Sequence, residues 1–330
     1  MSGFGVSGLF AHLALSADKE DAEELSLFQK VNAAVDRHAL PVHTAHDGQK
    51  APTEDALRVQ HQRDAITSLL SRAGLSQPHH TIVECGAGNG ALSQTLFRSS
   101  GAAGPSGYLL IDRKQQALQQ LPSAARFEEH AKQLWIDVAN LQPEMLRGAV
   151  ADQACQACVL LSNHMCGGAL DQAVRCAVGA WDGEARLAGV VAVTCCHHLC
   201  TWESYLGAAY FESLGMGAAE FEAVRRWSRM APRRGTPADR RQRVADAATR
   251  LGIGAADAAR FGLRCRQLLD SGRAYYLQQR GFDVQLLQHV PFSFTADNVM
   301  LLAVRARGQT GAGAMPDGAG GAQSPRQPPR

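Results

Sequence analysis

The sequence has no apolar run that approaches the roughly 20 residues needed to span a lipid bilayer. It also has little net charge, because 33 Lys and Arg residues against 31 Asp and Glu residues leave +2 at pH 7. We therefore expect a soluble protein without a membrane partner. A nucleic-acid partner would have to bind a local cluster of basic residues, since the whole chain is nearly neutral.

The beginning of the chain lacks positive charge as well. No Lys or Arg precedes Lys19, so this segment has neither the basic start of a secretory signal nor the arginines of a transit peptide. The nine cysteines are an odd number, and several lie inside apolar runs, which favours a reducing compartment such as the cytoplasm or nucleus. We expect residues 1–24 to form a disordered leader and the Gly- and Pro-rich residues 307–330 a disordered tail.

Hydrophobic residues make up 45% of the 330 residues, which is enough for a substantial core. Residues 26–38 and 53–73 have helical patterns and predict a helical N-terminal extension over 25–78. Short apolar runs follow, separated by helical segments, and these predict parallel strands that are buried on both faces. The runs are TIVEC, GYLLID, LWIDV, ACVLLS and LAGVVAVTC.

Two further apolar segments, FDVQLLQHV and NVMLLAVRA, predict a closing antiparallel pair of strands. Five parallel strands and such a pair give an α/β fold. The pattern matches the Rossmann-like, mostly parallel seven-stranded sheet of class I S-adenosylmethionine-dependent methyltransferases. We assign this domain to residues 79–306. The sheet alone does not fix a function.

A glycine-rich loop follows the first of these strands, at Glu84, Gly86, Gly88 and Gly90. Glycines allow the backbone to turn sharply and to approach a ligand closely. The third glycine comes one position earlier than in the dinucleotide-binding fingerprint. The pattern E-x-G-x-G-x-G resembles instead the first motif of class I methyltransferases. A tight turn that binds no ligand is the alternative.

Acidic residues stand near the ends of the next two strands as well. Asp112 ends the second strand, where such folds place an acid on the ribose hydroxyls of a cofactor. Asp137 lies in the third run, where an acid commonly meets the adenine amino group. A single Asp in such a place is more often a helix cap. Together with Glu84, these acids in the correct order predict S-adenosylmethionine as the cofactor.

Three segments are similar to successive blocks of the tRNA:m(4)X modification enzymes. They read SNHMCGGALDQAVRC, VTCCHHLCTWESYLGAAYF and RCRQLLDSGRAYYLQQRGF. The resemblance covers about residues 25–306. It implies a eukaryotic 2′-O-methyltransferase that transfers a methyl group from S-adenosylmethionine to nucleotide 4 of the tRNA acceptor stem.

The resemblance assigns Glu84, Gly86, Gly88 and Gly90 to the family's cofactor loop, and Asp137 to the motif that follows. It also matches His164, Cys166, Gly167, Cys195, Cys196, His197, His198, Cys200, Trp202, Leu269, Asp270, Gly272 and Arg273. The sequence departs from the family at Asn163, where a Lys is usual, and at 295–298, where TADN replaces Ser-x-Glu-Asn. Because the first cysteine is Cys85, we expect the family's small N-terminal zinc segments to be absent.

The cluster of Cys and His at 195–198 raises the question of a metal site. Structural zinc usually takes two separated pairs of ligands, whereas these residues are contiguous and should point to alternate faces of an extended chain. Cys155 and Cys158 should lie at the opposite end of the sheet. We therefore predict no metal site and interpret the cysteines as packing residues, with zinc as the alternative.

Methylation of a ribose hydroxyl requires a group that accepts its proton. Neutral imidazole can do this near pH 7, and Asn163 cannot. The candidate bases are His164, His197 and His198, with His197 or His164 preferred. A buried histidine that only satisfies backbone groups is the alternative for at least one of them.

A basic stretch follows, over residues 225–243. It holds eight arginines against Asp239 alone, a local excess of seven positive charges, within a basic insertion at about 225–260. Such a stretch can bind RNA phosphates, and an A-form stem is recognised through phosphates and 2′-hydroxyls. A solvated insertion is the alternative. The predicted RNA-binding residues are Arg225, Arg226, Arg229, Arg233, Arg234, Arg240, Arg241 and Arg243.

The sequence thus predicts a tRNA 2′-O-methyltransferase that uses S-adenosylmethionine and binds tRNA but not DNA. Two alternatives remain. A methyltransferase of proteins or small molecules would not need the arginine cluster. An inactive tRNA-binding module could survive loss of the cofactor site, and Asn163 keeps that possibility open. Protein partners are not predictable from the sequence.

Overall fold

The computed structural model describes residues 19–48, 50–118, 124–151, 155–181, 186–232 and 238–306. The first helix, α1, begins at Lys19, within the segment predicted to be a disordered leader. The rest of that leader and the predicted tail at 307–330 lie outside the described residues. In the part of the chain that is described, no helix is both long and apolar enough to cross a membrane.

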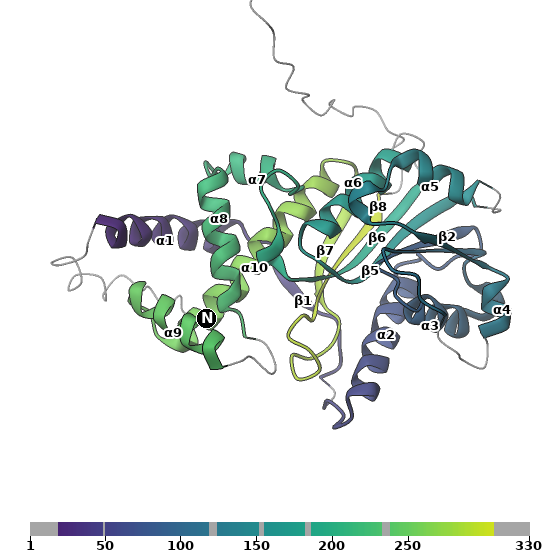
Figure 1. The fold of residues 1–330 in the computed structure, drawn as a ribbon, viewed down its shortest axis with the longest axis horizontal. Helices are drawn as coiled ribbons and strands as arrows, with labels where there is room; N and C mark the ends of the chain where they lie inside the picture. The colour runs from purple at the N-terminus through teal and green to yellow at the C-terminus, as the bar shows by residue number, and fades with distance from the viewer. Residues whose placement is uncertain are drawn as a thin grey trace, which may run out of the picture.

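The strands form a single sheet in the order β1-β7-β8-β6-β5-β2-β3-β4 (Figure 1). β8 runs antiparallel to its two neighbours, and all other pairs are parallel. The strands are β1 Val42–Thr44, β2 His80–Cys85, β3 Gly107–Asp112, β4 Ala131–Trp135, β5 Ala157–Cys166, β6 Leu187–Cys195, β7 Phe282–Gln288 and β8 Val299–Arg305.

The sheet confirms the mostly parallel α/β prediction and its closing antiparallel pair, but within the described ranges it has eight strands rather than seven. The additional strand is β1, from the segment predicted to be only helical. It pairs in parallel with β7 through Val42 and Leu286. A three-residue strand has too little pattern to be recognised in a sequence, yet it covers the backbone groups that β7 would otherwise expose at the sheet edge.

Helices cover both faces of the sheet, and others form a separate layer (Figure 1). They are α1 Lys19–His38, α2 Asp55–Arg72, α3 Ala91–Ser100, α4 Ala124–Glu128, α5 Pro143–Val150, α6 Gly168–Trp181, α7 Ala208–Ser213, α8 Ala218–Trp227, α9 Ala238–Arg250 and α10 Ala255–Gln278. Short 3₁₀ turns include η4 Val138–Asn140, η6 His197–Leu199 and η7 Ser228–Met230.

The two faces of the sheet have separate cores, because each strand alternates its side chains. On one face, β-strand residues such as Leu160 and Val190 pack with Trp181 of α6 and Leu277 at the end of α10. On the other face, the alternate strand residues pack against α2 and α3. β2, β3, β5 and β6 are therefore buried on both sides, as their continuous apolar runs predict, whereas the same prediction for LWIDV is wrong because β4 lies at the sheet edge and is partly exposed.

A third core joins the N-terminal helix to the region after β6. Phe28 of α1, Trp227 of α8 and Phe261 of α10 belong to it, and the ring centroids of Phe28 and Phe261 are 4.7 Å apart. The N-terminal extension and the predicted basic insertion thus share one apolar core. Because α10 begins in this helical layer and ends against the sheet, it fixes the layer to the methyltransferase-like domain.

Candidate active site

The glycine-rich loop joins β2 to α3 in a backbone conformation that favours glycine. Gly86, Gly88 and Gly90 all have positive φ, at 73°, 55° and 69°. A Cβ atom on Gly90 would lie 2.9 Å from Leu110 Cδ1, which is too close. The loop is anchored to the next strand, since the amides of Gly86 and Ala87 donate to the Ile111 carbonyl. A ligand that binds this loop would therefore meet a tight backbone turn that is held in place.

The predicted cofactor acid Asp112 lies directly beside this loop. Its Oδ2 accepts a hydrogen bond from Gly88 N at 2.9 Å, and its Oδ1 accepts from Lys114 N at 3.0 Å. Asp137 lies just beyond the end of β4, is exposed, and caps the η4 turn by accepting from Ala139 N at 3.0 Å. Both carboxylates keep further acceptor sites, because each oxygen has two lone pairs.

Glu84 occupies a different environment, beneath the loop rather than on it. It is buried and accepts hydrogen bonds from Ser93 N at 3.1 Å and Ser93 Oγ at 2.5 Å. Burial raises the pKa of Glu84 to about 7, although the Ser93 hydrogen bonds act in the opposite direction. Glu84 therefore fastens the first turn of α3 to β2, and its contribution to a cofactor site is the shape of the loop.

The end of β5 lies against the same loop. Met165 is the nearest side chain to Gly86, since a Cβ built on Gly86 would be 3.4 Å from Met165 Cε. The preceding His164 has φ 63°, a left-handed conformation that is uncommon for a residue with a side chain. The side-chain oxygen of Asn163 is buried and has no hydrogen-bond partner among the described residues. The segment after β5 is thus adjacent to the loop and contains an unsatisfied polar atom.

These features fit S-adenosylmethionine, which carries a charged methionine group, a ribose and an adenine. The glycine loop lets a ligand approach the backbone closely, and Asp112 offers acceptor positions for ribose hydroxyls. Buried oxygens without partners in the described structure remain at Gln94, just after the loop, and at Asn163. These groups would hold the cofactor beside the end of β5.

His197 belongs to a buried network that connects the end of β6 to α10. Its Nε2 lies 2.9 Å from Asp270 Oδ2, and the hydroxyl of Thr194 donates to the same carboxylate at 2.9 Å. Arg273 donates to Asp270 Oδ1 at 2.9 Å and to Asp171 Oδ2 at 2.8 Å. Burial alone would raise the pKa of Asp270, but its cationic and hydrogen-bonding neighbours lower it.

The network fixes how His197 is oriented. If Nε2 carries the proton that Asp270 accepts, Nδ1 is left as an acceptor, and it is buried without a partner in the described structure. His197, Thr194 and Asp270 line a cavity of about 160 Å³, together with Asp297 and Asn298 from the segment before β8. This arrangement is that of an imidazole positioned by a carboxylate.

The structure gives the other two candidate histidines different surroundings. His164 is half-buried and close enough to His289 to contribute to its charge environment; the pKa of His289 is lowered to about 4, mainly by burial. His198 lines a cavity of about 510 Å³ in the helical layer, with Trp227 and three arginines. His197, in contrast to these surroundings, lies against the buried carboxylate of Asp270.

The described arginines of the basic stretch lie in the helical layer. Arg225 donates to the His198 carbonyl and pairs with Glu222, and Arg226 pairs with Glu24 of α1 at 2.9 Å. Arg226 and Arg229 line the larger cavity, together with Arg250. Arg241 is exposed on α9. Arg233 and Arg234 lie outside the described residues, as do the side chains of Arg240 and Arg243.

Sequence reasoning missed two features of this site. The first is the chain of contacts from Asp171 through Arg273 to Asp270. Its signals in the sequence were the family resemblance at Asp270 and Arg273 and the spacing of these two residues on one helix face. The second is the direction of Cys196. The prediction that Cys195 and Cys196 point to opposite faces is wrong, because Cys196 has left-handed φ 48° and ψ 38° and is not extended.

The strand order β7-β8-β6-β5-β2-β3-β4 and the glycine loop after β2 define a class I methyltransferase fold. Residues 61–304 match the family described as Methyltransferase TRM13, and the chain belongs to this family. Its relatives include the tRNA:m(4)X modification enzyme TRM13 homolog of Mus musculus, at 26% identity over 84% of this chain and 70% of that protein. The human homolog is 24% identical over 74% of this chain and 63% of that protein.

A third relative, the tRNA:m(4)X modification enzyme TRM13 of Yarrowia lipolytica, is 26% identical over 73% of this chain and 58% of that protein. The chain thus spans only part of the length of these relatives. Among solved structures, the plantazolicin methyltransferase BpumL with SAH has a TM-score of 0.36 and 9% identity, covering 87% of this chain and 95% of that chain. Geranyl diphosphate methyltransferase with GPP and sinefungin has a TM-score of 0.33 and 11% identity, covering 87% and 100%.

Proposed function

We propose that this chain transfers a methyl group from S-adenosylmethionine to the ribose 2′-hydroxyl of nucleotide 4 in the tRNA acceptor stem. The match of residues 61–304 to a methyltransferase family carries the proposal, since relatives in that family are named tRNA:m(4)X modification enzymes. The glycine loop beside the end of β5 supplies the place where such a reaction would occur.

The cofactor-binding residues of the proposal are those of the loop and the two strand ends beside it. The loop at residues 86–90 would wrap the methionine part, Asp112 would bind the ribose hydroxyls and Asp137 the adenine amino group. Asp112 can keep its hydrogen bond from Gly88 N while it accepts from a hydroxyl. When bound, S-adenosylmethionine supplies an electrophilic methyl group.

His197 is the preferred proton acceptor for the ribose hydroxyl. Asp270 holds Nε2–H and leaves Nδ1 available, while Arg273 and Thr194 hold Asp270 in place. The carboxylate also stabilises the imidazolium that forms when the proton is taken up. Nδ1 is buried in the structure. Binding of the acceptor nucleotide must therefore move the side chains that cover this atom. His164, on the strand end beside the glycine loop, is the second candidate.

The arginine-lined cavity in the helical layer is proposed to contact the tRNA. Arg226, Arg229 and Arg250 surround it, with Trp227 and His198. Cationic side chains at such a surface neutralise phosphates without reading the sequence of the bases. His198 links this surface to the reaction end, because His197 is its neighbour in the η6 turn.

Transfer of labelled methyl from S-adenosylmethionine to unmodified tRNA tests the proposal, with a protein extract and a small-molecule pool as competing acceptors. Label in tRNA supports it, whereas label only in protein or small molecules contradicts it. Cofactor and tRNA binding without transfer would favour the inactive binding module, which Asn163 makes a specific second candidate.

A further inference from the structure

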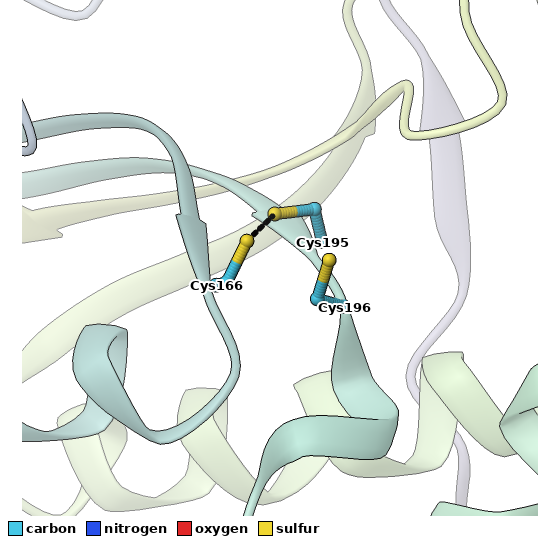
Figure 2. A group of neighbouring side chains, drawn as sticks. All are labelled: Cys166, Cys195 and Cys196. Carbon is cyan, nitrogen blue, oxygen red and sulfur yellow. Dashed lines mark hydrogen bonds between the residues drawn. The ribbon is translucent and has the colours of Figure 1, made fainter. Parts of the chain in front are cut away.

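Three cysteines gather where β5 and β6 end. The sulfur atoms of Cys166, Cys195 and Cys196 all lie within 4.8 Å of one another. Cys166 Sγ and Cys195 Sγ are 3.7 Å apart. Figure 2 shows the three side chains converging in the space between the two strand ends. The arrangement therefore offers three soft donor atoms to one point.

Strand pairing and one unusual backbone conformation produce this convergence. Cys166 and Cys195 are paired in register at the ends of adjacent parallel strands, so their side chains share a face of the sheet. Cys196 would point to the opposite face in an extended chain, but its left-handed backbone turns it toward the other two.

The left-handed conformation costs roughly 1 kcal/mol or more for a residue other than glycine. Within the described ranges, only His164 and Cys196 combine a side chain with positive φ. One lies two residues before Cys166 on β5, and the other directly follows Cys195 on β6. Both strands therefore adopt an unfavourable backbone at the point where the cysteines meet, and conformational strain of this kind clusters at functional sites.

The sulfur separation matches metal coordination better than a disulfide. Zinc–sulfur bonds of about 2.3 Å in a tetrahedron place two sulfurs about 3.8 Å apart. The observed 3.7 Å between Cys166 and Cys195 agrees with that edge. A disulfide requires about 2.05 Å and would leave the third sulfur without a role.

Coordination by three cysteines leaves one position of the tetrahedron open. Among the described residues, no fourth His, Cys, Asp or Glu joins the group. Cys166 is exposed, so solvent reaches the site, while Cys195 is buried. Three protein ligands with an open fourth position are typical of zinc sites that bind water or a substrate atom.

We propose that Cys166, Cys195 and Cys196 bind one zinc ion through three thiolates, with the fourth position open. Thiolate ligands select soft or borderline metal ions, and the 3.7 Å between Cys166 Sγ and Cys195 Sγ fits zinc among them. Zinc uptake displaces the thiol protons, which are released to the solvent. The site lies beside Met165, at the reaction end of the sheet. Its existence does not depend on methyl transfer.

The test is metal content of the full chain, purified under reducing conditions, incubated with Zn²⁺ and dialysed. We expect one zinc per chain, and a Co²⁺-loaded sample should show the charge-transfer and visible bands of tetrahedral thiolate coordination. C166S should reduce zinc affinity at least tenfold, and it is the primary variant because Cys166 is exposed and should tolerate the change. C195S and C196S should lose zinc too, with circular dichroism as the fold check.

The matched control is C155S. Cys155 Sγ lies 3.4 Å from Cys158 Sγ at the other end of β5, so this pair is the competing thiol site. C155S should keep its zinc. Any one of three results would overturn the proposal. The first is no zinc in the wild-type chain after loading, and the second is zinc loss in C155S but not in C166S. The third is a Cys166–Cys195 disulfide in the mass spectrum of reduced, zinc-loaded protein. None of these readouts requires the chain to methylate tRNA.

Discussion

Among single residues, Asp270 connects three groups at the reaction end. It accepts from Thr194, faces His197 Nε2 and pairs with Arg273, while it is almost fully buried. Burying a carboxylate is costly unless charged and hydrogen-bonding partners surround it, and loss of one partner typically costs about 3–5 kcal/mol. The stability of the fold therefore depends on keeping every partner of Asp270 in place. This fits a positioning role for Asp270.

H197A is predicted to lower kcat for tRNA methylation by about 10²- to 10⁴-fold, the range a positioned proton acceptor contributes. The affinity for S-adenosylmethionine should change little, because His197 faces Asp270 rather than the glycine loop. Single-turnover kinetics and calorimetric titration measure the two effects. H43A is the control, since His43 is exposed on β1. Equal rates for H197A and H43A would exclude His197 as the base.

Glu84 predicts a pH dependence of stability. Burial raises its pKa in the folded chain to about 7 from an ordinary value of 4.5, so the folded state binds the proton more tightly than the unfolded state. The free energy of unfolding should therefore fall as the pH rises from about 4.5 to about 7. E84Q keeps an acceptor for Ser93 and should lack this component.

Urea unfolding at several pH values measures the Glu84 effect. E128Q, at an exposed position on α4, is the matched control and should behave like the wild type. The explanation fails if E84Q and E128Q have the same dependence on pH.

At the scale of secondary-structure elements, the buried strands were predictable and their ends were not. The continuous apolar runs coincide with β2, β3, β5 and β6. Such runs are required only in strands that are covered on both faces. The LWIDV run was predicted as a whole, but β4 ends at Trp135, where its pairing with Asp112 stops. The left-handed backbone at Cys196 depends on the surrounding structure. No local sequence pattern predicts it.

The glycine loop gives a prediction at this same scale. G90A should weaken S-adenosylmethionine binding at least tenfold, because its Cβ would collide with Leu110 and because φ is 69°. G101A is the matched control: its φ is 56°, but the space for its Cβ is open. Calorimetric titration should show near-normal binding for G101A. Equal losses in both variants would mean that general backbone strain, rather than the loop, is responsible.

At the scale of the whole molecule, the helical layer ties the N-terminal helix to the region after β6. The sequence correctly indicated a helix in the N-terminal segment, but it could not show that Phe28, Trp227 and Phe261 share a core. Contacts between residues this far apart depend on the completed fold. The shared core places Glu24 beside Arg226 and Arg250, so part of the arginine charge is offset within the chain.

The same layer predicts how tRNA affinity depends on charge and salt. The double variant R226E/R229E should weaken tRNA binding, and the slope of log affinity against log salt should decrease by about one for each phosphate that is no longer neutralised. S-adenosylmethionine affinity should be unchanged. R98E, on the exposed side of α3, is the control. Filter binding at several salt concentrations measures these slopes. Identical slopes for R226E/R229E and R98E would mean that the tRNA does not bind at Arg226 and Arg229.

The position of the methyl group on tRNA decides whether the proposed function is correct. Unmodified tRNA is incubated with the chain and S-adenosylmethionine, digested to nucleotides and fragments, and mapped by mass spectrometry. We predict a methyl group on the ribose 2′-oxygen of nucleotide 4. A methyl group on a base, or on a ribose outside the acceptor stem, would contradict this function.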